Sequence, residues 1–314
     1  MTKKQPVTLL PYHKTTYRYQ KLKICNHCRQ YTLIADEPCP HCGRDQLISI
    51  EKKAEQLAQR STAVHVLLMI AAALLGILFG ETFLQMGLAA AVGAAAVAVY
   101  VIIRERTKSF FAMKELGQLI ERDEAKMIEG LFRNWEDAIE LWKTEPVNTY
   151  ERLREISTLQ RSEMIRIQQI ALLNTFILRK DMEIDLEPIM LRHFEPMLAE
   201  LIGEVAKVKR DAIKEHAIKY MVNYEIEVLE LNQGDQLLAQ VVGAAVRMRT
   251  YVEAYPNFIA RYARYLPKER FLRLYNMLSR SASSSLGHLT DEVYRIYKER
   301  YQWDADFQSG SKGL

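Results

Sequence analysis

Two consecutive apolar runs, residues 62–80 and 83–103, dominate the hydrophobic pattern of this chain. They contain one histidine, His65, and no Asp, Glu, Lys or Arg. At a rise of about 1.5 Å per residue, a helix of either length can cross a hydrocarbon layer of about 30 Å. The alternative is a pair of helices buried in a large soluble core. We expect a transmembrane helical hairpin that serves as an anchor.

Small residues recur at every fourth position in both predicted spans. Such residues let helix backbones approach closely where lipid supplies no hydrophobic driving force. We expect them to form helix–helix contacts, either within the hairpin or between two copies of the chain. These positions are Ala72, Gly76, Gly80, Gly87, Ala91 and Ala95.

Outside the spans, the two ends of the chain have different patterns. Apolar residues recur at helical spacing nearly throughout residues 104–314, and the stripe from Leu116 to Trp142 predicts a long helix continuing from the second span. Short alternating stretches at 17–24, 31–34 and 47–50 predict strands. The predicted fold is mainly α: a small N-terminal β module, the hairpin, and an all-α bundle or short irregular solenoid of six to eight helices.

Charge supports a division into residues 1–60, 61–103 and 104–314. Residues 1–60 hold 11 Lys and Arg against 5 Asp and Glu, so this segment should be drawn to anionic lipid. Basic residues flank the outer ends of both spans, whereas the connection 80–82 has none, so both termini are expected to be cytoplasmic. The flanking residues are Lys52, Lys53, Arg60, Arg104, Arg106 and Lys108.

All the cysteines lie in residues 1–60, as the pairs Cys25/Cys28 and Cys39/Cys42 with ten residues between the pairs. Each CxxC turn can direct two sulfurs to one point, and the intervening residues can form a hairpin that brings the turns together. The stretch 14–50 resembles a zinc ribbon, although the first turn, CNHCR, lacks the glycine that follows the second, CPHCG. The resemblance implies one structural zinc ion in a closed site that performs no chemistry.

Other interpretations of the cysteines remain open at this point. A thiol redox pair is one, and iron in a rubredoxin-like site is another, although no Glu-x-x-His pair accompanies the helices. With four cysteines present, His27 and His41 are expected to face solvent rather than bind the metal.

Two stretches combine basic and aromatic residues and are candidate interaction surfaces. The N-terminal one is Tyr17, Arg18, Tyr19, Lys21 and Lys23, a composition that can stack bases and neutralise phosphates, and equally that of an ordinary exposed strand. The C-terminal one can pair with the acidic stretch 181–235, bind a partner, lie on the membrane, or simply pack helices. It comprises Arg261, Tyr262, Arg264, Tyr265, Arg270 and Arg273.

Catalytic motifs are lacking: the chain contains no P-loop, dinucleotide turn, GxSxG or HExxH sequence. We therefore expect a non-catalytic, cytoplasm-facing membrane scaffold whose partners are membrane lipid, unidentified proteins and further copies of the chain. Two alternatives stay open. One is a membrane-tethered nucleic-acid-binding protein that uses residues 1–60, and the other is an enzyme with its site in residues 104–314.

Overall fold

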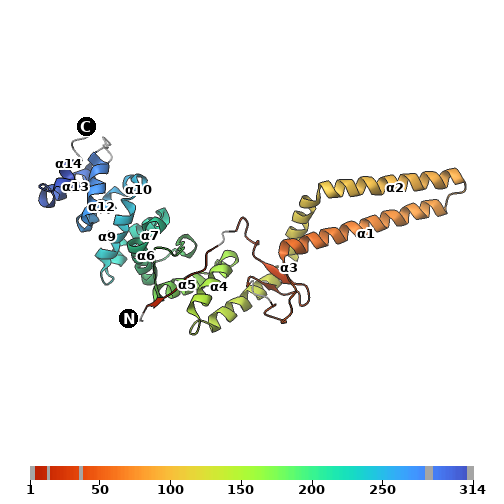
Figure 1. Cartoon of the computed structure of the whole chain (residues 1–314), viewed down its shortest axis with the longest axis horizontal. Coiled ribbons are helices and arrows are strands. Elements are labelled where there is room, and N and C mark those ends of the chain that lie inside the picture. Colours follow the sequence, from red (N-terminus) through yellow and green to blue (C-terminus); the bar gives the residue numbers. More distant parts are fainter. Residues whose placement is uncertain (1–3, 13–14, 35–37, 280–285, 310–314) are drawn as a thin grey trace. The chain divides into compact units, whose positions relative to one another are not determined.

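The computed structural model describes residues 4–12, 15–34, 38–279 and 286–309 (Figure 1). It is 70% helical with few strands, which confirms the predicted mainly-α fold class. Its contacts form two compact units. The hairpin unit contains residues 13–140 and 158–160, and the helical unit contains residues 1–12, 141–157 and 161–314. The contact units therefore differ from the compositional segments 1–60, 61–103 and 104–314.

The hairpin unit begins with a three-stranded antiparallel sheet in the order β3-β2-β4. Its strands are β2 (Lys23–Cys25), β3 (Tyr31–Thr32) and β4 (Leu47–Ser49). The strand expected over 17–24 is wrong for residues 17–21, which form turns. The cause is local hydrogen bonding, because the Leu22 N–H donates to the Tyr19 carbonyl at 3.0 Å and the Gln20 side chain accepts from the Thr16 N–H.

The long helix α1 (Ile50–Leu78) begins at the residue after β4, so the sheet leads directly into the first apolar span. The Ser49 hydroxyl caps it by accepting from the Lys52 N–H. Ile50, Ala54 and Ala58 are buried in its first turns. The helix α2 (Phe83–Arg106) follows a short turn and is capped by Thr82.

Helices α1 and α2 pack along a seam whose half-buried residues recur at spacings of three and four. A Cβ at Gly93 would lie only 2.4 Å from the Ala73 Cβ, so the backbones approach closely there. The seam consists of Thr62, Val66, Met69, Ala73 and Ile77 on α1, Gly80 in the turn after it, and Met86, Ala89, Gly93, Val97, Tyr100 and Arg104 on α2.

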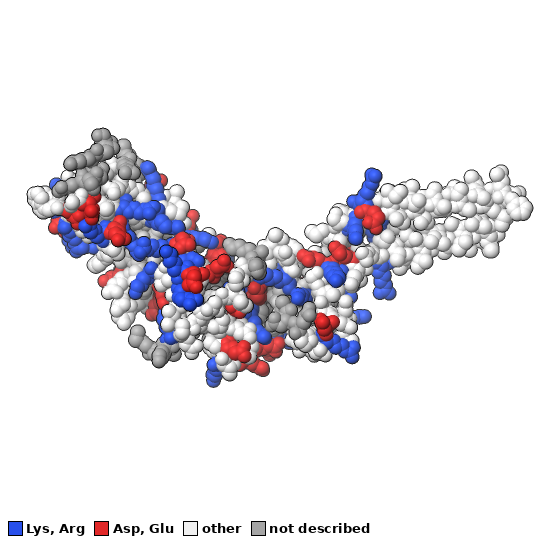
Figure 2. Space-filling model, in the orientation of Figure 1, with Lys and Arg blue, Asp and Glu red and all other residues white. Residues whose placement is uncertain are grey.

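Both helices are long and apolar enough to cross a membrane. No part of either apolar window is buried among the described residues, and Phe83 and Leu84 are 96% and 84% exposed. Figure 2 shows the hairpin free of charged side chains over most of its visible face, with Lys and Arg gathered at its base. The alternative of two helices buried in a soluble core of this chain is therefore wrong.

The helix α3 (Lys108–Glu140) packs beside the first turns of α1 (Figure 1). The expected continuation of the second span into one long helix is wrong, since Thr107 (φ −107°, ψ 15°) ends α2 and α3 sets off in a new direction. Burial of Leu116 and Leu119 explains this change of direction, because it turns the apolar face of α3 toward α1. A second break lies at Asp123 (φ −106°, ψ 15°).

The helical unit contains shorter helices around an apolar core in which α6 and α9 contribute Leu198, Leu201, Leu238 and Val241. The described part of residues 104–314 has more helices than the six to eight expected, because turns at Pro and Gly divide the apolar pattern. Besides α3, they are α4 (Pro146–Leu159), α5 (Glu163–Thr175), α6 (Pro196–Val208), α7 (Glu215–Asn223), α8 (Glu225–Leu229), α9 (Gly234–Ala245), α10 (Arg249–Ala254), α11 (Pro256–Tyr262), α12 (Lys268–Ser279), α13 (Gly287–Arg300) and α14 (Ala305–Ser309), with 3-10 turns at Glu187–Ile189, Arg210–Ala212 and Ala263–Tyr265.

Residues 4–12 belong to the helical unit. β1 (Gln5–Pro6) pairs in parallel with β5 (Phe176–Ile177), which follows α5, and Val7 is buried. The Leu10 N–H donates to Glu151 Oε1 at 2.7 Å, and Lys4 pairs with Glu204. The chain thus contributes residues 4–12 to the helical unit, then forms the hairpin unit, and then returns to the helical unit.

Candidate metal centre

Two turns bring all four cysteines together. Cys25–Cys28 begins at the last residue of β2 and precedes β3, and Cys39–Cys42 lies between β3 and β4. Their Sγ atoms lie within 4.8 Å of one another. The distances are 3.7 Å between Cys25 and Cys42 and 3.8 Å between Cys28 and Cys39. A tetrahedral ion with metal–sulfur bonds of about 2.3 Å places its sulfurs about 3.8 Å apart. The four cysteines therefore fit a single metal ion, and they are not joined as disulfides.

The two CxxC turns have the same backbone geometry although their sequences differ. The Arg29 N–H donates to the Cys25 carbonyl at 2.9 Å, and the Gly43 N–H donates to the Cys39 carbonyl at 2.8 Å. Both residues have a left-handed backbone conformation, with φ of 59° at Arg29 and 68° at Gly43. The glycine missing from CNHCR is thus replaced by an arginine held in a conformation that glycine adopts without strain.

The thiols do not ionise alike. Burial opposes ionisation of Cys25, but N–H donation from the backbone of Cys28 and His27 outweighs it and lowers the pKa of Cys25 to about 7. Burial raises the pKa of the Cys28 thiol. A bound cation stabilises all the thiolates together, so metal binding here releases protons and weakens as the pH falls.

The sheet that carries the cysteines is fixed to α3 by buried polar contacts. The Tyr31 hydroxyl donates to Asp123 Oδ2 at 2.9 Å. Asn134 Oδ1 accepts from the Thr32 hydroxyl at 3.0 Å and from the Leu33 N–H at 2.9 Å. A Cβ at Gly130 would lie 2.2 Å from the Tyr31 carbonyl oxygen, so only glycine lets β3 lie this close to the helix. The cysteine cluster is thereby built into the base of the hairpin.

Both histidines of the CxxC turns are exposed and outside the group of sulfur ligands. His41 lies 3.2 Å from the Arg133 guanidinium of α3, measured at Nδ1. Among the described residues, the four cysteines are the one cluster of three or more His, Cys, Asp or Glu side chains that can hold a metal ion.

The N-terminal basic and aromatic residues lie in the turns before β2, apart from Lys23, which is the first residue of that strand. Tyr17 donates its hydroxyl to Glu51 on α1, and Arg18 donates to the Leu159 carbonyl. Tyr19, Lys21 and Lys23 are half-buried.

The C-terminal set is divided between several contacts within the helical unit. Arg261 and Tyr262 both bind Glu225, which lies in the acidic stretch 181–235. Arg264 pairs with Glu299, and Arg273 donates to the Arg247 carbonyl at 2.6 Å. Tyr265 is 57% exposed, whereas Arg270 is half-buried near Arg210, and this burial lowers its pKa.

The six small residues of the apolar helices fall into three groups. Gly76 and Gly80 contact the other helix, since a Cβ at Gly76 would lie 3.5 Å from the Ala89 Cβ. Ala72 lines a cavity described below. Gly87, Ala91 and Ala95 lie on exposed faces, so packing between copies stays a prediction for them.

Sequence reasoning missed Asp123, Gly130 and Asn134, which position β3 against α3. The available signal was two polar residues and a glycine on the apolar stripe of a helix. Comparison of the chain with protein-family models, curated proteins and solved structures finds no match.

Proposed function

We propose that this protein is a non-catalytic membrane scaffold: a two-helix anchor that holds a zinc-stabilised module and a helical unit on the cytoplasmic side. The observation that carries the proposal is the continuity of β4 with α1, together with the docking of β3 on α3. The cysteine cluster is positioned to brace the base of the anchor. A closed four-sulfur site leaves no open coordination position for chemistry, which supports a structural role.

Zinc is the metal we assign to the site. Four thiolates in two CxxC turns suit both zinc and iron, because metal–sulfur lengths are similar. A purely structural position favours an ion without redox chemistry. The helices also provide no di-iron motif of the kind that accompanies rubredoxin-like modules.

The anchor confines its attached units to a plane, which raises the effective concentration of bound partners. Charge supports the assignment of both ends to the cytoplasm, since Arg104 and Arg106 end α2 while the connection 80–82 carries no Lys or Arg. The helical unit offers a second surface for protein partners.

Membrane extraction combined with proximity labelling tests this function. The full chain, with a labelling enzyme fused to either end, should stay in membranes after alkaline carbonate treatment and label cytoplasmic proteins from both ends. Purified protein should contain one equivalent of zinc. Cys28→Ser/Cys39→Ser should lose the metal and change the labelled set, whereas the control His27→Ala/His41→Ala should do neither.

Three results would overturn the proposal. The first is release of the chain by carbonate, and the second is labelling of opposite compartments by the two ends. The third is recovery of nucleic acid as the main salt-sensitive partner of residues 1–60, which would favour the nucleic-acid-binding alternative.

A further inference from the structure

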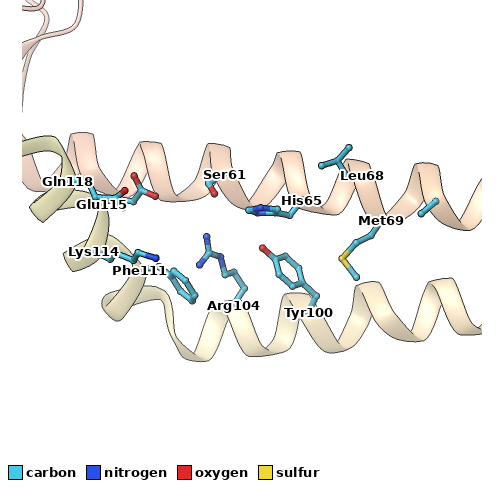
Figure 3. A pocket seen from close by; sticks show the side chains of 11 residues that line it. Ser61, His65, Leu68, Met69, Tyr100, Arg104, Phe111, Lys114, Glu115 and Gln118 are labelled. Atoms are coloured by element: carbon cyan, nitrogen blue, oxygen red, sulfur yellow. The ribbon is translucent and has the colours of Figure 1, made fainter. Parts of the chain in front are cut away.

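A cavity of about 590 Å³ opens at the base of the hairpin, between α1, α2 and the start of α3 (Figure 3). It lies entirely within the hairpin unit. Eleven residues line it: Ser61, His65, Leu68, Met69, Ala72, Tyr100, Arg104, Phe111, Lys114, Glu115 and Gln118.

The lining changes from apolar to charged along the hairpin. Leu68 and Met69 line the end toward the hairpin tip, and Arg104, Lys114 and Glu115 line the end at α3 (Figure 3). Ala72, also in the lining, follows Met69 on α1 toward the tip. The rings of His65 and Tyr100 lie between these ends in an edge-to-face contact of 6.1 Å. Amphipathic rings occupy the same level at a membrane interface, between hydrocarbon and headgroups.

Arg104 is held in place with most of its donors unused. Its guanidinium lies 3.4 Å from the centre of the Phe111 ring, and its Nε donates to the Thr62 hydroxyl at 2.9 Å. That hydroxyl in turn donates to the Ala58 carbonyl. Within the described part of the chain, the two terminal nitrogens of Arg104 make no hydrogen bond. Four N–H groups of a rigid, planar donor thus remain for a ligand.

The charges in the cavity favour an anion. Among the described residues, neither Lys114 nor Glu115 belongs to an ion pair, so the lining holds two cations against one carboxylate. A singly charged anion balances this set. Arg and Lys are also the side chains that bind phosphate oxygens most effectively.

We propose that this cavity binds one anionic glycerophospholipid of the inner leaflet. The phosphate diester accepts hydrogen bonds from Arg104 and Lys114, and the acyl chains run along Leu68, Met69 and Ala72. Glu115 faces the polar part of the headgroup. The inference rests on the proposed membrane insertion, and it assigns to the base of the anchor a lipid-selective site in addition to the anchoring function.

The apolar end and the size of the cavity distinguish a lipid from a free phosphate ion. A volume of 590 Å³ lies within the range of pockets for small organic ligands, and an inorganic phosphate would leave the Leu68–Ala72 end unfilled. A second copy of the chain would have to bring its own anionic group to the same place.

Binding of defined lipids to the full-length protein in neutral detergent micelles tests the proposal. Dioleoyl phosphatidylglycerol should bind and raise the thermal midpoint, while dioleoyl phosphatidylcholine and sodium phosphate should not. Arg104→Gln should weaken phosphatidylglycerol binding about tenfold, as expected for the loss of one charge-assisted interaction. Arg106→Gln is the matched control, because it removes the same charge from the same helix end outside the cavity lining.

Two further variants keep the test decisive. Lys114→Gln repeats the charge test if Arg104→Gln does not fold, as judged by circular dichroism and zinc content. Ala72→Phe fills the apolar end and should weaken lipid binding without changing any charge.

Equal binding by Arg104→Gln and Arg106→Gln, equal binding of the two lipids, or equal protection by phosphate alone would overturn the lipid site. Native mass spectra that show bound chain copies in place of lipid would also overturn it. If the chain stays in membranes after carbonate treatment but shows no lipid preference, this inference alone fails. Release by carbonate would instead remove the proposed function.

Discussion

The sheet that carries the metal centre and the helical unit differ in what holds them together. Between the sheet and α3, the buried residues include Thr32, Asp123 and Asn134, which make directional hydrogen bonds. The helical unit instead buries Leu198, Val242 and many other apolar side chains completely. Polar docking depends on geometry, whereas apolar burial tolerates small shifts. The two regions should therefore respond differently to the same kind of perturbation.

Metal removal should produce the largest difference in response between the two regions. Structural zinc sites contribute about 10 kcal/mol or more of apparent binding free energy, and the small sheet lacks a large core to replace it. We expect chelation, or Cys28→Ser/Cys39→Ser, to expose β2–β4 to hydrogen exchange and to loosen the first turns of α1. The core of the helical unit, at α6 and α9, should keep its protection.

Hydrogen exchange read by mass spectrometry measures both regions in one sample. His27→Ala/His41→Ala provides the control and should leave both patterns unchanged. Equal loss of protection in α6 and α9 on chelation would show that the regions are not independent.

Alanine at buried glycines should reveal the next largest difference. At Gly130 the new Cβ would meet the backbone carbonyl of Tyr31 at 2.2 Å, whereas at Gly243 it would meet the flexible end of the Arg270 side chain. We expect Gly130→Ala to cost about 3 kcal/mol through overpacking, and Gly243→Ala to cost less because the arginine can move.

Gly117→Ala is the matched control on α3, since nothing lies within 4 Å of a Cβ there. It should stabilise the protein by about 0.5–1 kcal/mol, because alanine favours the helix. Denaturant unfolding monitored by tryptophan fluorescence gives all three values. A cost at Gly117 equal to that at Gly130 would contradict close docking of β3 on α3.

The Tyr31–Asp123 contact should make the stability of the sheet depend on pH. Burial works against the Asp123 carboxylate, but hydrogen bonds from Arg122 and Tyr31 outweigh it and lower the pKa of this carboxyl. A carboxyl whose pKa is lowered by folding stabilises the fold fully at pH values above its pKa in the unfolded chain, which is about 4. This stabilisation is lost as the pH falls through its pKa in the folded protein. We expect Asp123→Asn to cost about 1–2 kcal/mol at neutral pH.

The difference between wild type and Asp123→Asn should therefore shrink as the pH falls below 4 toward the folded pKa. Both proteins also lose stability when the metal is released at low pH, and this shared loss cancels when the two stabilities are subtracted. Urea midpoints at a series of pH values provide the measurement. A difference that does not change with pH would mean that the charge of Asp123 contributes nothing to docking.

The parts of this structure that were predictable from sequence have local patterns. The apolar spans and the CxxC pairs are each contained within a few turns of chain, so spacing alone predicts two long apolar helices and one sulfur cluster. The pairing of β1 with β5 is different, because it joins residues 171 positions apart and neither strand has a periodic pattern of its own. Pairing of the acidic and basic stretches was expected as one alternative, but nothing local identified Glu225 as the partner of Arg261 and Tyr262.

The hairpin seam shows what the spacing of small residues alone does not identify. Small residues at every fourth position predicted contacts through Ala72 and Ala91, among others. The seam within the hairpin follows spacings of three and four and passes through Ala73, Ala89 and Gly93. Contacts between copies through Ala91 stay a prediction. Because alanine is abundant in both spans, composition did not distinguish the seam from the outward faces.

The smallest expected effect concerns the two CxxC turns themselves. Arg29 and Gly43 have the same left-handed backbone, which costs a side-chain-bearing residue about 1–2 kcal/mol. Arg29→Gly should therefore stabilise the sheet by somewhat less than about 1 kcal/mol, because glycine also gains freedom in the unfolded chain. Gly43→Ala should destabilise it by a similar amount, through backbone strain alone, since nothing lies within 4 Å of its Cβ.

Competition with a chelator at fixed zinc measures both effects as changes in metal affinity, in opposite directions. Arg29→Ala is the control, because it removes the arginine side chain but keeps the Cβ that causes the strain. If Arg29→Ala bound zinc as tightly as Arg29→Gly, the side chain rather than the backbone would be responsible. The two turns would then share their backbone conformation, but this conformation would not cost Arg29 free energy.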